Sequence, residues 1–294
     1  MQVGVIDWHW WDLPVEKRLR RIADLGFEGV QLAVTPTELG FDLKNGVASW
    51  FDSRYRPATR SFKKGDLARV LRETGLKVTQ LGPHYALGEH YSMKGSSTGV
   101  FRSNEARRHR LADINRMIDL AADLDTEFVE VMSGGDPKKP EQWPELVEFV
   151  RELADHAEER GVTLTFENMG GWQMLVADEN SLFRLVRDVG SKAVRVTFDP
   201  KNLTQTHYQA DIPRAVRALR GLIVFTHAGD AIFGEGSVSP LGVGTVPFPD
   251  YLLALRDAGF DGWSCIEALK KEEDYPVSRK YLEDLIRLLV EPKL

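Results

Sequence analysis

Four side chains of types that commonly bind divalent cations end short apolar segments in the second half of the chain. The segments VTLTFE, VRVTFD, LIVFTH and WSCIE end at Glu167, Asp199, His227 and Glu267. Each is too short for a helix and rich in β-branched and aromatic residues, which is typical of a buried strand. Oxygen ligands with one imidazole favour Mn²⁺, with Mg²⁺ or Co²⁺ as alternatives, over a structural zinc site. Taken singly, each residue could instead make an ordinary ion pair or hydrogen bond.

A repeat of helix followed by strand would position these four residues. Amphipathic stretches end at a glycine, or once at an aspartate, where a helix needs a left-handed C-terminal residue. These ends are Gly26, Gly75, Asp125, Gly161, Gly190, Gly221 and Gly259. With a first strand at GVIDW, the repeat gives eight strands separated by helices, which predicts a parallel (β/α)8 TIM barrel of the α/β class. No linker or composition break divides the chain, so residues 1–294 are expected to form a single domain.

The alternation of side chains along a strand predicts where the four candidates point. Because successive side chains face opposite sides, Glu167 shares a side with Thr165, and Asp199 shares one with Thr197. The other side of each strand is apolar and would pack against the helices. All four candidates therefore point inward at the carboxyl-terminal ends of consecutive strands. Inward carboxylates repel one another, and a divalent cation among them would relieve that repulsion.

The amino-acid composition limits the kinds of binding partner and the cellular compartment that we expect. The net charge of −6 argues against nucleic acid or an anionic membrane as the main partner, and no stretch approaches the ~20 apolar residues of a membrane span. No secretory signal is recognisable after Met1, and the single Cys265 fits a reducing compartment, so we expect a cytoplasmic protein. The charged residues 18–21 are expected to lie on a solvated helix face.

The loops after the second and third strands, over residues 35–64 and 83–103, are long and aromatic. In a barrel such loops surround the mouth where active sites lie. Their rings could stack on a sugar, pack the loops together or form the interface of a homo-oligomer. The tryptophans in or beside loops at this end are Trp8, Trp10, Trp11, Trp50 and Trp172.

The chain resembles the xylose isomerase-like barrels, in particular the sugar phosphate isomerase/epimerase family. The resemblance rests on Glu167-Asn168, on Asp199, on the H-x-x-D motif from His227 to Asp230, and on Ile266-Glu267. The G-x-G of Gly242 to Gly244 also resembles this family. The resemblance implies that Glu167, Asp199, His227 and Glu267 hold one divalent metal ion. It also implies that Glu167 and Glu267 are the catalytic acid and base acting on a small sugar or sugar phosphate.

Other residues are predicted to contact the substrate or support the site. Family members of the epimerase type carry a histidine three residues after the strand-six aspartate, where this chain has Asn202, which cannot transfer a proton at neutral pH. His207 lies nearby and is more typical of a surface loop. His84 and His9 follow strands at the mouth, and Trp8 and Trp172 lie there too. Asp230 is expected to orient His227 or a nearby base. Lys201 and Lys270 are expected to be solvated, and Glu130 to form a salt bridge in the core.

Four functions are weighed for this chain. A metal-dependent sugar isomerase or epimerase leads, and a dehydratase acting on a keto-sugar or keto-cyclitol is close behind because of Asn202. An endonuclease IV-like phosphodiesterase needs three metal ions and more histidines than this chain places at strand ends. A non-catalytic sugar-binding barrel is disfavoured by the intact set of four ligand candidates.

Overall fold

The computed structural model describes residues 1–10, 13–34, 64–83, 100–101, 103–169, 174–206, 210–233, 238–267 and 269–290. Most of the two long loops predicted after the second and third strands lies outside these residues. The strands are β1 Gln2–Ile6, β2 Gly29–Val34, β3 Lys77–Pro83, β4 Phe128–Val131, β5 Thr163–Glu167, β6 Val194–Phe198, β7 Ile223–Ala228 and β8 Trp263–Ile266. The helices are η1 Asp7–Trp10, α1 Val15–Asp24, α3 Lys64–Thr74, α4 Asn104–Asp123, α5 Gln142–Arg160, α6 Glu179–Val189, α7 Pro200–Thr206, α8 Ile212–Ala218, α9 Phe248–Asp257 and α10 Asp274–Leu289.

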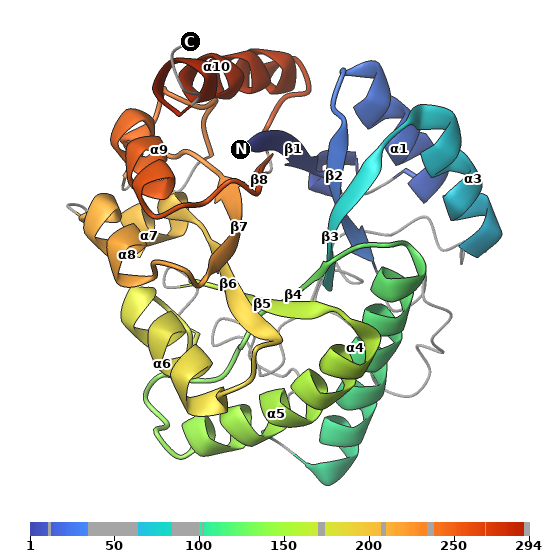
Figure 1. Ribbon diagram of the computed structural model, residues 1–294, viewed down its shortest axis with the longest axis vertical. Helices are drawn as coiled ribbons and strands as arrows, with labels where there is room; N and C mark the ends of the chain where they lie inside the picture. Colours follow the sequence, from blue (N-terminus) through green and yellow to red (C-terminus); the bar gives the residue numbers. More distant parts are fainter. Residues whose placement is uncertain are drawn as a thin grey trace.

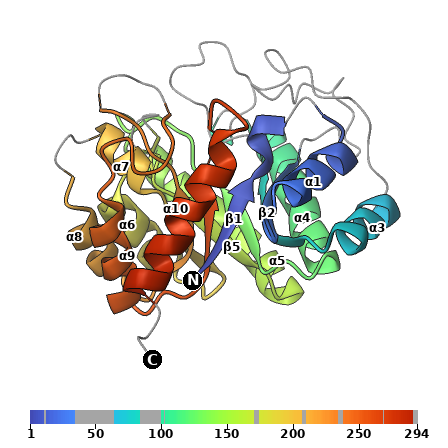
Figure 2. The same ribbon diagram turned by 90° about the horizontal axis from the view of Figure 1, so that it is seen from above.

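The eight strands form one closed parallel barrel. Each strand pairs with the next in chain order, and β8 pairs with β1 to close the sheet. The helices surround the strands, as Figure 1 shows. In the side view, β1 runs upward from the N-terminus with helices on both sides of the strands (Figure 2). The predicted (β/α)8 architecture is confirmed.

The helix ends follow from local chemistry. Asp178 begins α6 because its carboxylate accepts a hydrogen bond from the backbone N–H of Ser181, whose side chain bonds back to Asp178. Gly161 and Gly190 end α5 and α6 in the left-handed conformation, which glycine adopts without a Cβ penalty. Asp125, predicted to take the place of a glycine, has a positive φ of 55°. These boundaries agree with the sequence prediction.

The strand faces agree with the predicted alternation. On the inward face, Thr197 donates to Thr165 at 2.8 Å, and Gln80 of β3 donates to the hydroxyls of both threonines. The outward residues Leu164 and Phe166 are fully buried in the hydrophobic layer between strands and helices. The barrel interior is therefore polar just below its mouth, which is the environment that a cluster of carboxylates requires.

One prediction about the outer surface is wrong. Arg18, expected on a solvated face of α1, is only 1% exposed and forms an ion pair of 2.7 Å with Asp7. Asp7 directly follows β1, and its second oxygen accepts from the backbone N–H of Ala33 in β2. The arginine is buried because the first turns of α1 cover the strand ends where Asp7 lies. The ion pair thus ties α1 to the barrel beside its mouth.

Among the described helices, none has the length and apolar character needed to cross a bilayer.

Candidate metal centre

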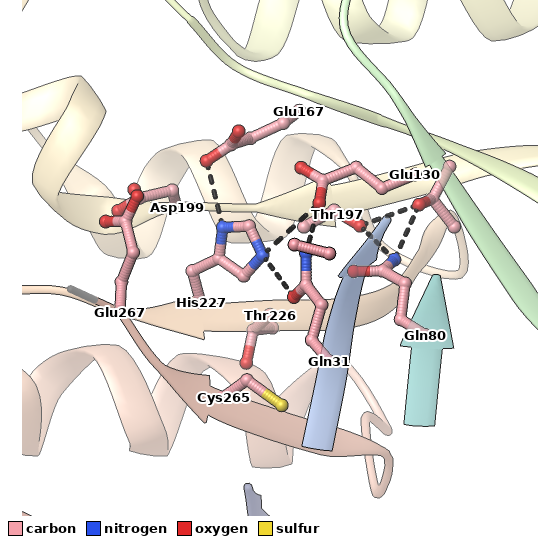
Figure 3. Close-up of polar contacts among 12 residues, drawn as sticks. Gln31, Gln80, Glu130, Glu167, Thr197, Asp199, Thr226, His227, Cys265 and Glu267 are labelled. Carbon is pink, nitrogen blue, oxygen red and sulfur yellow. Dashed lines mark hydrogen bonds and ion pairs between the residues drawn. The ribbon is translucent and has the colours of Figure 1, made fainter. Parts of the chain in front are cut away.

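The four predicted ligands lie together at the carboxyl-terminal end of the barrel. Glu167 is the last residue of β5, His227 lies near the end of β7, and Asp199 and Glu267 directly follow β6 and β8. One ligand atom from each residue lies within 4.8 Å of the others, and all four side chains are buried (Figure 3). Burying three carboxylates and an imidazole at this spacing costs free energy, and a divalent cation among them would offset that cost.

Asp199 offers a free oxygen to this cluster. Its Oδ1 accepts from the backbone N–H groups of Lys201 at 2.7 Å and Asn202 at 3.3 Å, at the first turn of α7. Its backbone is fixed by Asn168, which accepts from the Asp199 N–H and donates to the Asp199 carbonyl. Among the described residues, its buried Oδ2 has no hydrogen-bond donor. A buried carboxylate oxygen without a donor fits the role of a metal ligand.

Lys201 adds a positive charge to the cluster. Its Nζ contacts Glu267 Oε2 and lies 3.6 Å from Asp199 Oδ2, and the residue is only 6% exposed. The prediction of a solvated lysine is therefore wrong. Because α7 starts directly after Asp199, its first turn lies over the mouth and directs residue 201 toward the carboxylates. Lys270, by contrast, is exposed as predicted.

Gly229 makes room for this lysine. A Cβ at position 229 would lie 3.0 Å from Glu267 Oε2 and 3.0 Å from Lys201 Cδ. Such contacts are tighter than ordinary van der Waals packing, so a side chain here would displace one of the two groups. Packing of Lys201 and Glu267 thus explains why position 229 of the H-x-x-D motif is a glycine in this chain.

His227 is held from both sides. Its Nδ1 lies 2.9 Å from Glu167 Oε1, and its Nε2 lies 2.9 Å from Gln31 Oε1 (Figure 3). Gln31 comes from β2 and donates its amide N–H to Glu130 of β4. Glu130 also lies 3.8 Å from His227 Nε2. Glu130, expected in a core salt bridge, is therefore an inward-facing neighbour of the candidate ligands.

The electrostatics of this group favour a proton on the imidazole. Burial raises the pKa of Glu130 to about 8, although the charge of His227 opposes that shift. Burial alone would lower the pKa of His227, but the carboxylates of Glu167 and Glu130 outweigh it and raise the pKa to about 9. A cationic ring donates from both nitrogens, which agrees with its contacts to Glu167 and Gln31.

Asn202 contacts a candidate catalytic residue directly. Its Nδ2 donates to Glu167 Oε1 at 2.9 Å and also approaches the sulfur of Met169. The amide lies on α7, one residue beyond Lys201, where the same turn directs it over the end of β5. Its predicted contact with substrate stays a prediction, and its contact with Glu167 gives it a role in orienting that carboxylate.

Asp230 organises the loop that follows β7. One of its oxygens accepts from the N–H groups of Gly242 and Gly244, both at 2.9 Å, and the other accepts from Ala231 and Val246. A Cβ at Gly244 would lie 2.1 Å from this carboxylate. The predicted G-x-G therefore closes around Asp230. These bonds go to the loop rather than to His227, and a contact of Asp230 with substrate stays a prediction.

The remaining substrate-binding predictions divide into two groups. His9 Nδ1 lies 3.0 Å from the carbonyl of Leu269, and Trp8 packs on the small apolar cluster inside the barrel, so both lie at the mouth. His84 and Trp172 lie outside the described residues, as does His207.

Three residues near the site were not assigned to it by sequence reasoning: Lys201, Gln31 and Glu130. A weak signal existed for Lys201, because the first turn after a strand-end ligand commonly faces the mouth of a barrel. Gln31 and Glu130 occupy inward positions of short strands, where a polar residue is costly unless it has a partner. Their partner is His227, which comes from a distant segment that the sequence does not pair with them.

Comparison with known proteins identifies the family and supports the fold. The sequence model of the family described as xylose isomerase-like TIM barrel matches residues 19–285. An uncharacterized protein of Methanocaldococcus jannaschii is 26% identical over 198 residues, which cover 64% of this chain and 66% of that protein. The match therefore spans slightly less than two thirds of this relative's length.

Solved structures of low sequence identity share the fold. A D-psicose 3-epimerase of Clostridium cellulolyticum H10, solved with D-tagatose, is 18% identical and superposes with a TM-score of 0.72, covering 99% of this chain and 100% of the other. A D-tagatose 3-epimerase-like protein is 20% identical, with a TM-score of 0.73 and 98% of both chains covered.

Proposed function

The chain belongs to the xylose isomerase-like TIM barrel family, and from this premise we propose that it is a divalent-metal-dependent isomerase or epimerase of a keto-sugar or keto-sugar phosphate. The observation that carries the proposal is the convergence of Glu167, Asp199, His227 and Glu267 in one buried cluster at the barrel mouth. Mn²⁺ is the ion we favour, with Mg²⁺ or Co²⁺ as alternatives, because oxygen ligands dominate the set.

The donor set defines what each residue does. A divalent ion bound here would polarise the substrate carbonyl and favour loss of the neighbouring proton. Glu167 ends β5 and Glu267 follows β8, so the two carboxylates reach the cluster from different strands, and each carries an oxygen that can accept a proton. One carboxylate removes the proton next to the carbonyl to give an enediolate. The other glutamate, starting as the carboxylic acid, gives its proton to the opposite face of the same carbon, or to the neighbouring carbon.

The residues around the two glutamates tune this exchange. Asn202 and His227 both contact Glu167 Oε1, so that oxygen is held in place from two sides. Lys201 contacts Glu267, so this carboxylate is paired with a buried ammonium group. The two glutamates therefore differ in environment, which suits two different proton-transfer roles.

A dehydratase is the second candidate, and Asn202 is the observation that favours it. An amide at this position cannot shuttle a proton, so an epimerisation that needs a third proton-transfer group would lack it here. Elimination needs the same proton removal followed by loss of a hydroxyl from the next carbon as water. The ammonium of Lys201, close to Glu267, could supply the proton that this leaving hydroxyl takes up.

Solvent deuterium exchange tests the proposal. The Mn²⁺-loaded protein is incubated in D2O with D-tagatose, D-psicose and other keto-sugars, free and phosphorylated, and followed by proton NMR. We expect loss of the signal next to the carbonyl together with a new epimer, or an unsaturated product if the protein is a dehydratase. Glu167→Gln and Glu267→Gln should each slow exchange by about 10²–10⁴-fold.

The matched control is Glu283→Gln, because Glu283 lies on α10 with a half-exposed side chain whose ion pair is with Arg279 of the same helix. This variant should exchange at the wild-type rate. Either glutamate variant of the cluster that turned over its substrate as fast as the control would exclude that residue from proton transfer.

A further inference from the structure

A row of three buried polar side chains, linked by hydrogen bonds, crosses the barrel below the candidate metal centre. Glu130 of β4, Gln31 of β2 and His227 of β7 come from strands far apart in the sequence, and Figure 3 shows them side by side. Glu130 is 5% exposed, Gln31 1% and His227 0%. Polar side chains buried to this extent are hydrogen-bonded in folded proteins. The donor and acceptor atoms of each side chain therefore determine the direction of its hydrogen bonds.

The direction of these hydrogen bonds follows from Glu130. A carboxyl oxygen of Glu130 accepts from the amide nitrogen of Gln31. That contact fixes which way the amide lies, because its nitrogen can only donate and its oxygen can only accept. The oxygen therefore faces His227, at 2.9 Å from Nε2. An acceptor at this distance requires a proton on Nε2.

A proton held on Nε2 decides which nitrogen can bind a metal ion. Nδ1 is the ring nitrogen that faces the candidate ligand Glu167, since it lies 2.9 Å from Glu167 Oε1. We infer that Gln31, oriented by Glu130, fixes His227 as the Nε2–H tautomer and thereby leaves Nδ1 to act as the metal ligand. Gln31 is thus a positioning residue, and the inference rests on the metal site of the proposed function.

The barrel offers an internal comparison for this role. Gln80 lies on the neighbouring strand β3 and is as buried as Gln31. Its amide nitrogen donates to the hydroxyls of Thr165 and Thr197, so its partners are neutral side chains below the cluster. Replacing Gln80 removes a buried amide of the same size without touching His227. It therefore separates loss of packing from loss of the hydrogen bond to the ligand.

The first arm of the test measures metal affinity. Gln31→Leu and the longer Gln31→Met remove the acceptor, and Gln80→Leu is the control; Mn²⁺ binding to each full-length protein is measured by titration calorimetry. Removing the partner of a metal-bound histidine typically weakens metal binding by about 10–100-fold, and we expect that loss for both Gln31 variants. Gln80→Leu should bind Mn²⁺ like the wild type. Equal affinity in the Gln31 and Gln80 variants would overturn the inference and leave the proposed function intact.

The second arm takes its readout from the wild-type protein and uses a variant only to assign signals. Wild-type protein labelled with ¹⁵N-histidine and loaded with diamagnetic Zn²⁺ is studied by long-range proton–nitrogen NMR. The His227 signals, assigned by their loss in His227→Asn, should show a protonated Nε2 and a proton-free Nδ1. A proton on Nδ1 in the loaded protein would overturn the inference. A wild-type protein that bound neither Mn²⁺ nor Zn²⁺ would overturn both the inference and the proposed metal site.

Discussion

The ammonium group of Lys201 lies against the carboxylate of Glu267 inside the cluster that also contains the three other candidate ligands. Both side chains are almost fully buried. The same ammonium approaches Asp199 Oδ2, the oxygen that has no hydrogen-bond donor among the described residues. A cation supplied by the chain therefore already meets two of the carboxylates that a divalent ion would bind.

Lys201→Met should make the folding of the protein depend on metal. Removing one partner of a buried ion pair typically costs about 3–5 kcal/mol, because the other charge stays buried without compensation. We expect a lower unfolding temperature in EDTA and a larger rise on adding Mn²⁺ than in the wild type. Thermal unfolding followed by circular dichroism, with and without the ion, measures both effects.

Lys270→Met is the control for this prediction. Lys270 closely follows a strand end, as Lys201 does, but it comes after β8 and is exposed, so its replacement should leave both unfolding temperatures near those of the wild type. If Lys201→Met behaved like this control in EDTA, the ammonium would not stabilise the carboxylates.

Asn202→Ala should reduce turnover more than substrate binding. The amide holds Glu167 Oε1 at 2.9 Å, and losing it leaves the carboxylate less well oriented for proton transfer. Misplacement of a reacting group can lower the rate by about 10²-fold, so we expect a fall in kcat of this order with a small change in KM. Steady-state kinetics on the keto-sugar found by deuterium exchange measures this split. Asn180→Ala, at an exposed position on α6, should have no effect.

Metal binding should release a proton at neutral pH. With its pKa raised to about 9, His227 is protonated at pH 7, and an ion bound at Nδ1 must displace one proton. Metal affinity should therefore rise with pH until the pKa is passed. The stability that this protonated ring gives the metal-free protein is complete below its unfolded pKa of about 6.5 and is lost as the pH rises through 9.

Calorimetry in buffers with different ionisation enthalpies counts these protons. Mn²⁺ titrations at pH 7 should show release of about one proton per ion, and titrations above pH 9 should show almost none. No proton release at pH 7 would show that the ring is neutral before the ion binds.

Gly244→Ala should disrupt the loop after β7. The new Cβ would lie 2.1 Å from Asp230 Oδ1 and 2.7 Å from the backbone nitrogen of Ala231, so the hydrogen bonds that close the loop cannot all persist. Limited proteolysis should cut the variant faster between residues 231 and 246. Gly65→Ala is the control, because nothing lies within 4 Å of a Cβ there. Equal cleavage rates would show that Asp230 does not hold the loop closed.

Much of the fold could be read from local patterns. The helix ends at Gly161, Gly190 and Asp125 and the alternation that turns Thr165 and Thr197 inward depend only on neighbouring residues. Such preferences are set by backbone sterics and strand pleating, which do not need the rest of the molecule. The four ligand candidates could also be predicted from the sequence, because the carboxyl-terminal strand ends of a parallel barrel meet at one mouth.

The residues around the ligands depend on contacts that the sequence does not encode locally. Arg18 and Lys201 looked like ordinary solvated cations, yet each is buried against a carboxylate that follows a strand end. Gln31 and Glu130 are recognised as neighbours of His227 only once β2, β4 and β7 are placed around the barrel axis. Their partners lie far along the chain, and periodicity alone cannot pair them.

The central claim is that Glu167, Asp199, His227 and Glu267 hold one divalent ion, and a metal count tests it most directly. Wild-type protein and Asp199→Asn are stripped with EDTA, reloaded with Mn²⁺, freed of excess ion and measured by elemental analysis. Asparagine keeps the shape of the side chain but removes its charge. We predict one ion per chain in the wild type and a large loss in the variant. No bound ion in the wild type, or equal amounts in both proteins, would contradict the account.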